Sequence, residues 1–152
     1  MVTISSIGRG IPKHAVKQSD AKTLIRNLFP YPEKQLNRLL PIFDHTLIEE
    51  RQFIVEENWF ETNHSLEERN QLFEQKALQY ALKAVDQCLT NKDFLNSHIS
   101  YENIDLIVYV SSTGLMTPSL DAYLMNERPF KETVQRMPLW GLGCAGGAIG
   151  LS

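Results

Sequence analysis

The sequence predicts an α/β fold built around a parallel sheet, and three observations carry this prediction. Residues 104–110 (IDLIVYV) form a nearly continuous apolar run rich in β-branched residues, which is typical of a strand buried on both faces. Residues 137–142 give a second buried strand that leads directly into a glycine-rich segment. Helical patterns precede and separate the two strands. We therefore expect a layered, mostly parallel sheet with helices on its faces.

The first thirty residues predict a short strand followed by a helix. Residues 2–7 alternate loosely between apolar and polar and lead into a turn rich in glycine and proline. Ser19 or Asp20 is then placed to cap a helix with apolar residues at the i, i+3, i+4, i+7 and i+8 positions of residues 21–29. Pro30 is expected to end this helix.

Further short elements lead to the longest helix of the chain. A helix is predicted over residues 33–40, ended or kinked by Pro41, and residues 51–55 give a short strand before a loop. Ser65 and Glu68 form the S-x-x-E capping box, in which each side chain satisfies a backbone donor of the other. The helix that follows has one broad apolar stripe, so one of its faces should pack on the sheet. A further helix is expected over 120–126, and another begins at residues 148–152.

Composition restricts the class of protein. A chain of 152 residues has the usual size of one domain, so we expect residues 1–152 to form a single domain. The net charge of −3 and the absence of a Lys/Arg cluster argue against a nucleic-acid partner. No signal peptide is recognisable, and no run approaches the ~18 apolar residues of a membrane span. The expected location is the cytoplasm.

The cysteines and histidines do not have the spacing of a metal site. Cys88 and Cys144 lie far apart, and the four histidines are scattered along the chain. In a reducing cytosol both thiols should be free, so each is either part of the core or part of a reaction. Cys88 lies on the apolar stripe of the long helix, which predicts a core position.

Cys144 lies where a buried strand passes into a helix, within the segment GLGCAGGAIG. A helix N-terminus carries about half a positive charge, which favours a thiolate, and its N–H groups can bind a developing oxyanion. Five glycines in these ten residues are more than helix packing needs, because each costs helix stability. From the residues alone two interpretations stay open, a catalytic nucleophile or a small buried side chain at a tight junction.

The segment GLGCAGGAIGLS resembles the nucleophile segment of the chalcone synthase family, the type III polyketide synthases. The upstream stretch SSTGLMTPSLDAYLMNE resembles the family's loop of the form S/T-S/T-G-x-x-x-P, and ERN and TLIEERQF also resemble family elements. No Phe follows Cys144 as it does in the plant enzymes, so the resemblance is closer to bacterial members.

The resemblance implies a thiolase-like fold of two similar α/β halves, usually in a homodimer. Cys144 would carry an acyl starter taken from coenzyme A, which malonyl-CoA then extends by decarboxylative condensation. Acyl-CoA and malonyl-CoA are substrates, and no bound cofactor is implied. Of the family's three basic CoA-phosphate contacts, Arg38 matches, and the other two fall on Pro41 and His45. For Arg38, a solvated charge on a helix face is an equally good interpretation.

Two threonines match or adjoin the family's pocket loop. Thr117 occupies the loop position that carries a methionine in plant members, and Thr113 lies in the same loop. Both are candidate pocket residues. For Thr113, turn formation beside Gly114 is an equally good interpretation.

The resemblance covers only the N-terminal part of the family's fold. The last helix stops within about two turns, which indicates a truncation in the nucleophile helix. The family's catalytic His and Asn lie further downstream, and none of the four histidines here takes that place. We therefore expect the isolated chain to lack condensing activity.

Two alternative functions stay open. One is another thiolase-fold condensing enzyme, such as an initiating β-ketoacyl synthase or a hydroxymethylglutaryl-CoA synthase. The other is a nonenzymatic domain that binds acyl-CoA or a protein partner.

Overall fold

The computed structural model describes residues 3–152, which divide into two compact units. One unit is Ile11–His64, and the other joins the residues up to Gly10 with Ser65–Ser152. We call them the 11–64 unit and the 65–152 unit. That residues 1–152 act as one domain stays a prediction.

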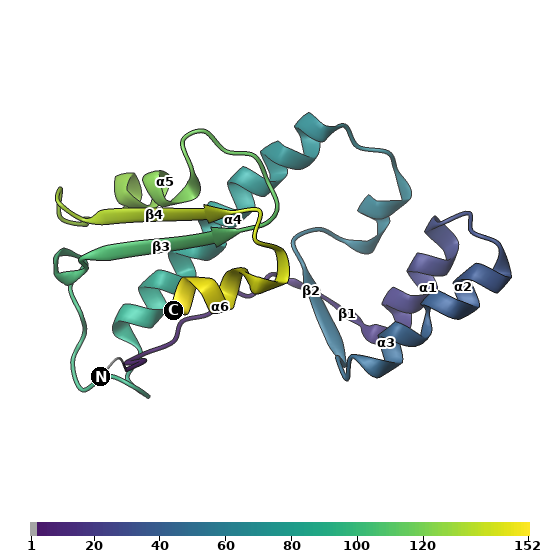
Figure 1. Cartoon of the computed structure of the whole chain (residues 1–152), viewed down its shortest axis with the longest axis horizontal. Helices are drawn as coiled ribbons and strands as arrows, with labels where there is room; N and C mark the ends of the chain where they lie inside the picture. The colour runs from purple at the N-terminus through teal and green to yellow at the C-terminus, as the bar shows by residue number, and fades with distance from the viewer. Residues whose placement is uncertain (1–2) are drawn as a thin grey trace. The chain divides into compact units, whose positions relative to one another are not determined.

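The 11–64 unit combines a short antiparallel pair of strands with the helices that lie between them in the chain (Figure 1). In chain order its elements are β1 (His14–Lys17), α1 (Gln18–Leu28), α2 (Glu33–Leu39), α3 (Pro41–His45), β2 (Glu50–Phe53) and the 3₁₀ helix η1 (Glu57–Glu61). β1 and β2 pair antiparallel, with His14 opposite Phe53. Three features confirm predictions: α1 ends before Pro30, α2 matches the helix expected at 33–40, and α2 ends before Pro41, which begins the next helix.

The predicted cap of α1 is wrong. Ser19 and Asp20 lie inside the first turn, and Lys17 occupies the N-cap position without a side-chain bond. The helix begins early because β1 leads directly into it: the Gln18 N–H donates to the Glu49 carbonyl at 2.9 Å, alongside the β1–β2 ladder. A backbone acceptor on the neighbouring chain segment therefore satisfies a donor that a side-chain cap would otherwise serve.

The predicted strand at residues 2–7 is also wrong over its described part, and Val2 lies outside the described residues. Residues 3–10 are not in a sheet. Their polar groups bond to the end of a long helix instead: Ser6 Oγ donates to the Cys88 carbonyl (2.7 Å), and the Ile7 carbonyl accepts from Asn91 Nδ2 (3.0 Å). A strand needs a neighbouring strand for its ladder, and here a helix takes that place.

The 65–152 unit begins with that helix, α4 (Leu66–Thr90). The capping box is confirmed, because the Glu68 N–H donates to Ser65 Oγ (3.1 Å) and the Ser65 N–H donates to Glu68 Oε2 (2.7 Å). The elements that follow are η2 (Tyr101–Asn103), β3 (Leu106–Ser111), α5 (Leu120–Glu127), β4 (Gln135–Trp140), η3 (Gly143–Ala145) and α6 (Gly146–Leu151).

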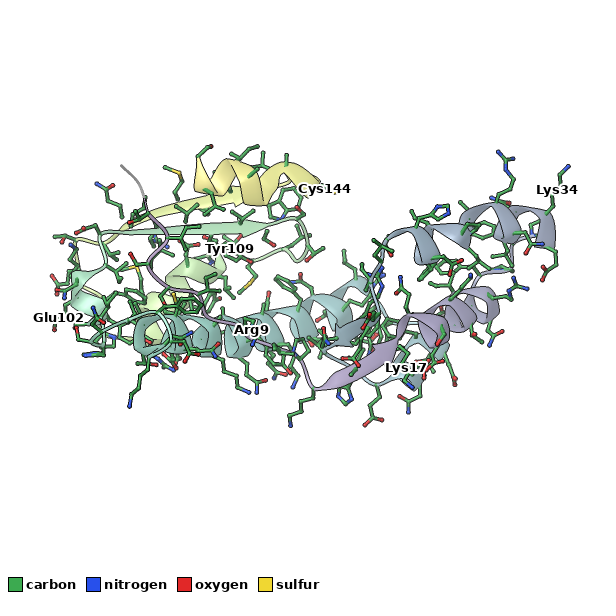
Figure 2. The ribbon with its side chains drawn as sticks, turned by 90° about the horizontal axis from the view of Figure 1, so that it is seen from below. Arg9, Lys17, Lys34, Glu102, Tyr109 and Cys144 are labelled. Atoms are coloured by element: carbon green, nitrogen blue, oxygen red, sulfur yellow. The ribbon has the colours of Figure 1, made fainter. Side chains whose placement is uncertain are left out.

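β3 and β4 form a parallel pair, as predicted, with Leu106 opposite Gln135 and Ser111 opposite Trp140. Helices lie on both faces of this pair: Figure 2 shows α6 on one side and α4 on the other. The fold is therefore α/β and layered, with a parallel sheet.

The predicted burial of both strands is wrong. Leu106 and Met137 are 41% and 49% exposed, and Trp140 is 61% exposed. Within the described residues this sheet has only two strands, so each strand has one unpaired edge, and α6 packs on Val108 and Val110 of β3. β4 also ends two residues earlier than expected, because Gly141 turns the chain away with a φ of 77°.

Three elements of the 65–152 unit are joined by a charged cluster. Two nitrogens of the Arg128 guanidinium, Nε and Nη2, donate to the Asp86 carboxylate at 2.8 and 2.6 Å. The Tyr101 hydroxyl donates to the same carboxylate. The hydrogen bonds from Arg128 are the main reason that the pKa of Asp86 lies below its ordinary value of 3.8. Burial is the main reason that the pKa of Tyr101 is raised. The cluster connects α4, η2 and the end of α5.

Asp86→Asn should lower stability at neutral pH by about 1 kcal/mol, a modest figure because the pair is partly exposed. The lowered pKa means that the carboxylate stabilises the fold above the ordinary value of 3.8 and loses this effect as the pH falls through the folded pKa. Urea unfolding at a series of pH values should therefore show the difference between wild type and variant shrinking below about pH 4. A difference that stays constant down to pH 2 would contradict this role.

Candidate active site

Cys144 lies in a tight turn between β4 and α6. β4 ends at Trp140, the Gly141 N–H donates to the Ser111 carbonyl at the end of β3 (3.1 Å), and η3 then carries Cys144 to the start of α6. The thiol is free and exposed. Figure 2 shows Cys144 at the end of α6 that faces the carboxyl ends of the strands. The predicted strand–turn–helix setting is therefore confirmed, and the thiol is open to a reactant.

The glycines around Cys144 have two different roles. Gly141 and Gly143 have φ values of 77° and 53°, a region that side chains disfavour. Gly146 and Gly150 instead bring α6 close to β3, because a Cβ on either would lie 2.6 or 2.8 Å from a methyl of Val110. Helix packing therefore explains two of the glycines, contrary to the expectation from the sequence, and turn geometry explains two others.

A pocket of about 220 Å³ opens at the same edge of the sheet. Its walls are largely apolar and aromatic, and they include Phe73 of α4, Tyr109 of β3 and Trp140 of β4. Hydroxyl groups come from Ser111, Thr117 and Ser119. Such a combination of apolar walls and a few polar groups is typical of a site for a small organic molecule. Cys144 is not among the described residues that line it, although it follows Trp140 by only a short turn.

The loop between β3 and α5 forms one side of this pocket, and hydrogen bonds attach it to two other elements. The Asn70 side chain donates to the Leu115 carbonyl and accepts from the Leu115 N–H, both at 2.7 Å. On the other side, Trp140 Nε1 donates to the Gly114 carbonyl at 3.2 Å. The loop is therefore fixed to α4 and to β4 through its backbone.

Asn70→Ala should release this loop without unfolding the unit. Removing both bonds leaves the Leu115 amide unprotected, so its hydrogen exchange should become about tenfold faster, the effect of about 1.4 kcal/mol in local opening. Gln71→Ala is the matched control, because Gln71 bonds to Glu67 of its own helix. Amide exchange measured by NMR tests this, and equal rates at Leu115 in both variants would contradict the role of Asn70.

Only one of the two candidate pocket threonines lines the pocket. Thr117 lines the pocket. Thr113 does not; it lies in a turn in which Ser111 Oγ donates to the Thr113 carbonyl (2.6 Å), and it borders a second hollow beside α4. The turn interpretation of Thr113 therefore has direct support.

The candidate CoA contacts lie in the 11–64 unit. Arg38 lies in the last turn of α2, and His45 is the last residue of α3. Both are exposed, and within residues 3–152 neither forms an ion pair. Pro41, at the third matched position, is the first residue of α3 and supplies no donor.

Several residues of the pocket were missed from the sequence. Phe73, Tyr109 and Trp140 were assigned only to apolar stripes and strands, which does not show that they line one pocket. Asn70 lies in the ERN segment that resembles the family, but its bond to a loop 45 residues away has no local signal. Cys88 lies on α4 as predicted, but its side chain is half-buried, so the predicted core position is wrong.

Within residues 3–152, no group of three or more His, Cys, Asp or Glu side chains is placed to hold a metal ion. None of the helices described has the length and apolar character needed to cross a bilayer.

The fold and the site define a class of protein: a parallel pair of strands covered by helices, with an exposed cysteine in the turn that follows a strand. This is the arrangement expected for the N-terminal part of a thiolase-like fold. The family model described as "Chalcone and stilbene synthases, N-terminal domain" matches residues 1–152. The chain belongs to this family.

Relatives and solved structures agree with this assignment. A protein of Bacillus subtilis (strain 168) named "Putative chalcone synthase" is 43% identical over 152 residues, covering 100% of this chain and 42% of its own length. A 1,3,6,8-tetrahydroxynaphthalene synthase of Streptomyces coelicolor is 28% identical and is covered over 39% of its length. The expected resemblance to bacterial type III polyketide synthases is confirmed.

The crystal structure of the Streptomyces coelicolor 1,3,6,8-tetrahydroxynaphthalene synthase, a bacterial type III polyketide synthase, superposes with a TM-score of 0.82 at 27% identity, covering 97% of this chain and 41% of that chain. A type III pentaketide synthase from Neurospora crassa shares the fold, with a TM-score of 0.77 at 19% identity. The chain thus spans about two fifths of the length of these proteins.

Proposed function

We propose that the protein is a type III polyketide synthase in which Cys144 carries the growing acyl chain. The observation that supports this best is the exposed Cys144 thiol in a glycine turn at the carboxyl end of the sheet, in a chain that the family model matches throughout. A nucleophile in such a turn is open to substrate while the strand behind it holds the backbone in place.

In the loading step, the Cys144 thiolate attacks the carbonyl carbon of an acyl-CoA thioester. A new carbon–sulfur bond forms, the tetrahedral intermediate collapses, and the coenzyme A thiolate leaves. The backbone N–H of Cys144 is a donor for the oxyanion. Malonyl-CoA then loses carbon dioxide, and the resulting carbanion attacks the Cys144 thioester and releases the thiolate for another cycle.

The remaining parts of the proposal concern substrate contacts. Arg38, with His45 when protonated, would contact the phosphates of coenzyme A, because both are exposed and neither forms an ion pair within residues 3–152. Thr117 and the aromatic walls of the 220 Å³ pocket would contact the acyl group. For the whole protein we propose acyl-CoA and malonyl-CoA as substrates without a bound cofactor, a homodimer, and a cytoplasmic location.

Peptide mass spectrometry tests the loading step. The full-length protein carrying this chain would be incubated with a panel of acyl-CoAs, digested, and searched for acyl groups on Cys144 and Cys88. Acylation of Cys144 is the expected result. Acylation of neither cysteine, or of Cys88 alone, would overturn the proposal. Adding malonyl-CoA then distinguishes a polyketide synthase, which extends the Cys144-bound chain, from a domain that only binds acyl-CoA.

A further inference from the structure

The 11–64 unit contains an apolar groove that the proposed reaction does not use. One wall is the apolar face of α1, with Leu24, Ile25 and Leu28. The opposite wall consists of three aromatic rings, Phe43, Phe53 and Phe60, of which the last two meet edge to face at 5.4 Å. The volume is about 340 Å³. This lies within the range of roughly 300–1,000 Å³ found for small-molecule sites.

Of the described residues that line the groove, Arg51 alone carries a charge. Its Nε donates to Gln18 Oε1 at 2.9 Å, and its guanidinium lies 5.8 Å from the centre of the Phe43 ring. These contacts fix the cation at the wall of the groove. Within residues 3–152 no carboxylate forms an ion pair with it.

A half-buried guanidinium beside apolar walls lacks part of its hydration, so an incoming carboxylate would gain a charge-assisted and bidentate partner. The rest of the groove offers aliphatic side chains and ring faces, which favour a hydrocarbon. The stripe on α1 runs from Ala21 to Phe29, about 12 Å at the helical rise of about 1.5 Å per residue, so the groove suits an extended chain.

We propose that this groove binds a medium-chain aliphatic carboxylate, with the hydrocarbon along α1 and the carboxylate on Arg51. The site lies wholly within the 11–64 unit and includes neither Cys144 nor the candidate CoA contacts. The test of this binding site is therefore independent of the test of the proposed condensing function.

Sodium decanoate is the probe, added to the full-length protein carrying this chain, with ¹³C-labelled Leu and Ile methyl groups. NMR should show saturable shifts at Leu24, Ile25 and Leu28, with affinity rising about threefold per methylene from hexanoate to decanoate. Decanol, which has the same chain without the charge, should bind at the same methyl groups about tenfold more weakly.

Two variants separate the carboxylate contact from general adsorption. Arg51→Gln should weaken decanoate binding about tenfold and leave decanol binding unchanged. Arg26→Gln is the matched control, because Arg26 lies on α1, which forms one wall of the groove, but is not itself a groove residue and pairs with Glu33. It should bind decanoate as the wild type does.

Three results would overturn the proposal. The first is the absence of saturable shifts at the α1 methyl groups. The second is equal binding of decanoate by Arg51→Gln and wild type. The third is a pattern in which the shifts spread over the exposed apolar residues of the 65–152 unit, such as Leu106 and Ile149, which indicates adsorption. Retention of the fold in each variant is checked from its methyl spectrum without ligand.

Discussion

Cys144→Ala is expected to lower the rate of acyl transfer from acyl-CoA to the protein by at least about a thousandfold, because the acyl group then has no sulfur to form a thioester. Cys144 is exposed and lies in a turn, so the substitution removes the nucleophile without opening a cavity in the core. Intact-protein mass spectrometry against time, on the full-length protein carrying this chain, measures the rate. The melting temperature should stay within a few degrees of wild type.

Cys88→Ala is the matched control, since it makes the same chemical change at a half-buried thiol on α4. This variant should load the acyl group at the wild-type rate. If Cys144→Ala still loads normally, or if Cys88→Ala loses loading with its fold intact, the role assigned to Cys144 is wrong. Product formation provides a second readout, because condensation requires the loaded thioester.

Gly146→Ala should destabilise the 65–152 unit by about 2 kcal/mol. The new Cβ would lie 2.6 Å from Val110 Cγ1, and a β-branched side chain on a strand has little freedom to move aside. Overpacking of this kind costs about 1–3 kcal/mol, partly offset by the better helix propensity of alanine. Urea unfolding followed by circular dichroism measures the loss as a lower midpoint with an unchanged slope.

Gly147→Ala is the control for this prediction. It is the next residue of the same helix, and a Cβ there meets no atom within 4 Å. The substitution should therefore be neutral or stabilising by up to about 1 kcal/mol. Equal destabilisation by both variants would show that the glycines serve the turn rather than the contact between α6 and β3. Stabilisation by both would show that α6 can shift to admit the methyl group.

The sequence predicted the elements around Cys144 but not the roles of the individual glycines. The strand, the turn, the helix and the position of Cys144 between them were all predictable, because each depends on neighbouring residues. The separate reasons for the individual glycines were not. Gly146 is required by Val110, which lies on another strand, and no pattern within either segment indicates that contact.

Local physical chemistry determined much of this protein from its sequence. The capping box at Ser65 and Glu68 satisfies donors within one turn, and proline lacks the N–H that a helix interior needs. Apolar runs rich in branched residues favoured the parallel strands, and the segment around Cys144 carried the resemblance to the family. These signals lie within a few residues of one another, so a single sequence is enough to recognise them.

The tertiary structure alone decided which distant groups meet. It placed residues 3–10 along α4 instead of in a sheet, fixed the pocket loop through Asn70, and joined Asp86 to Arg128 across 42 residues. Such contacts depend on how whole elements pack, and the free energy of a hydrogen bond or a buried side chain depends on a partner that local sequence does not specify.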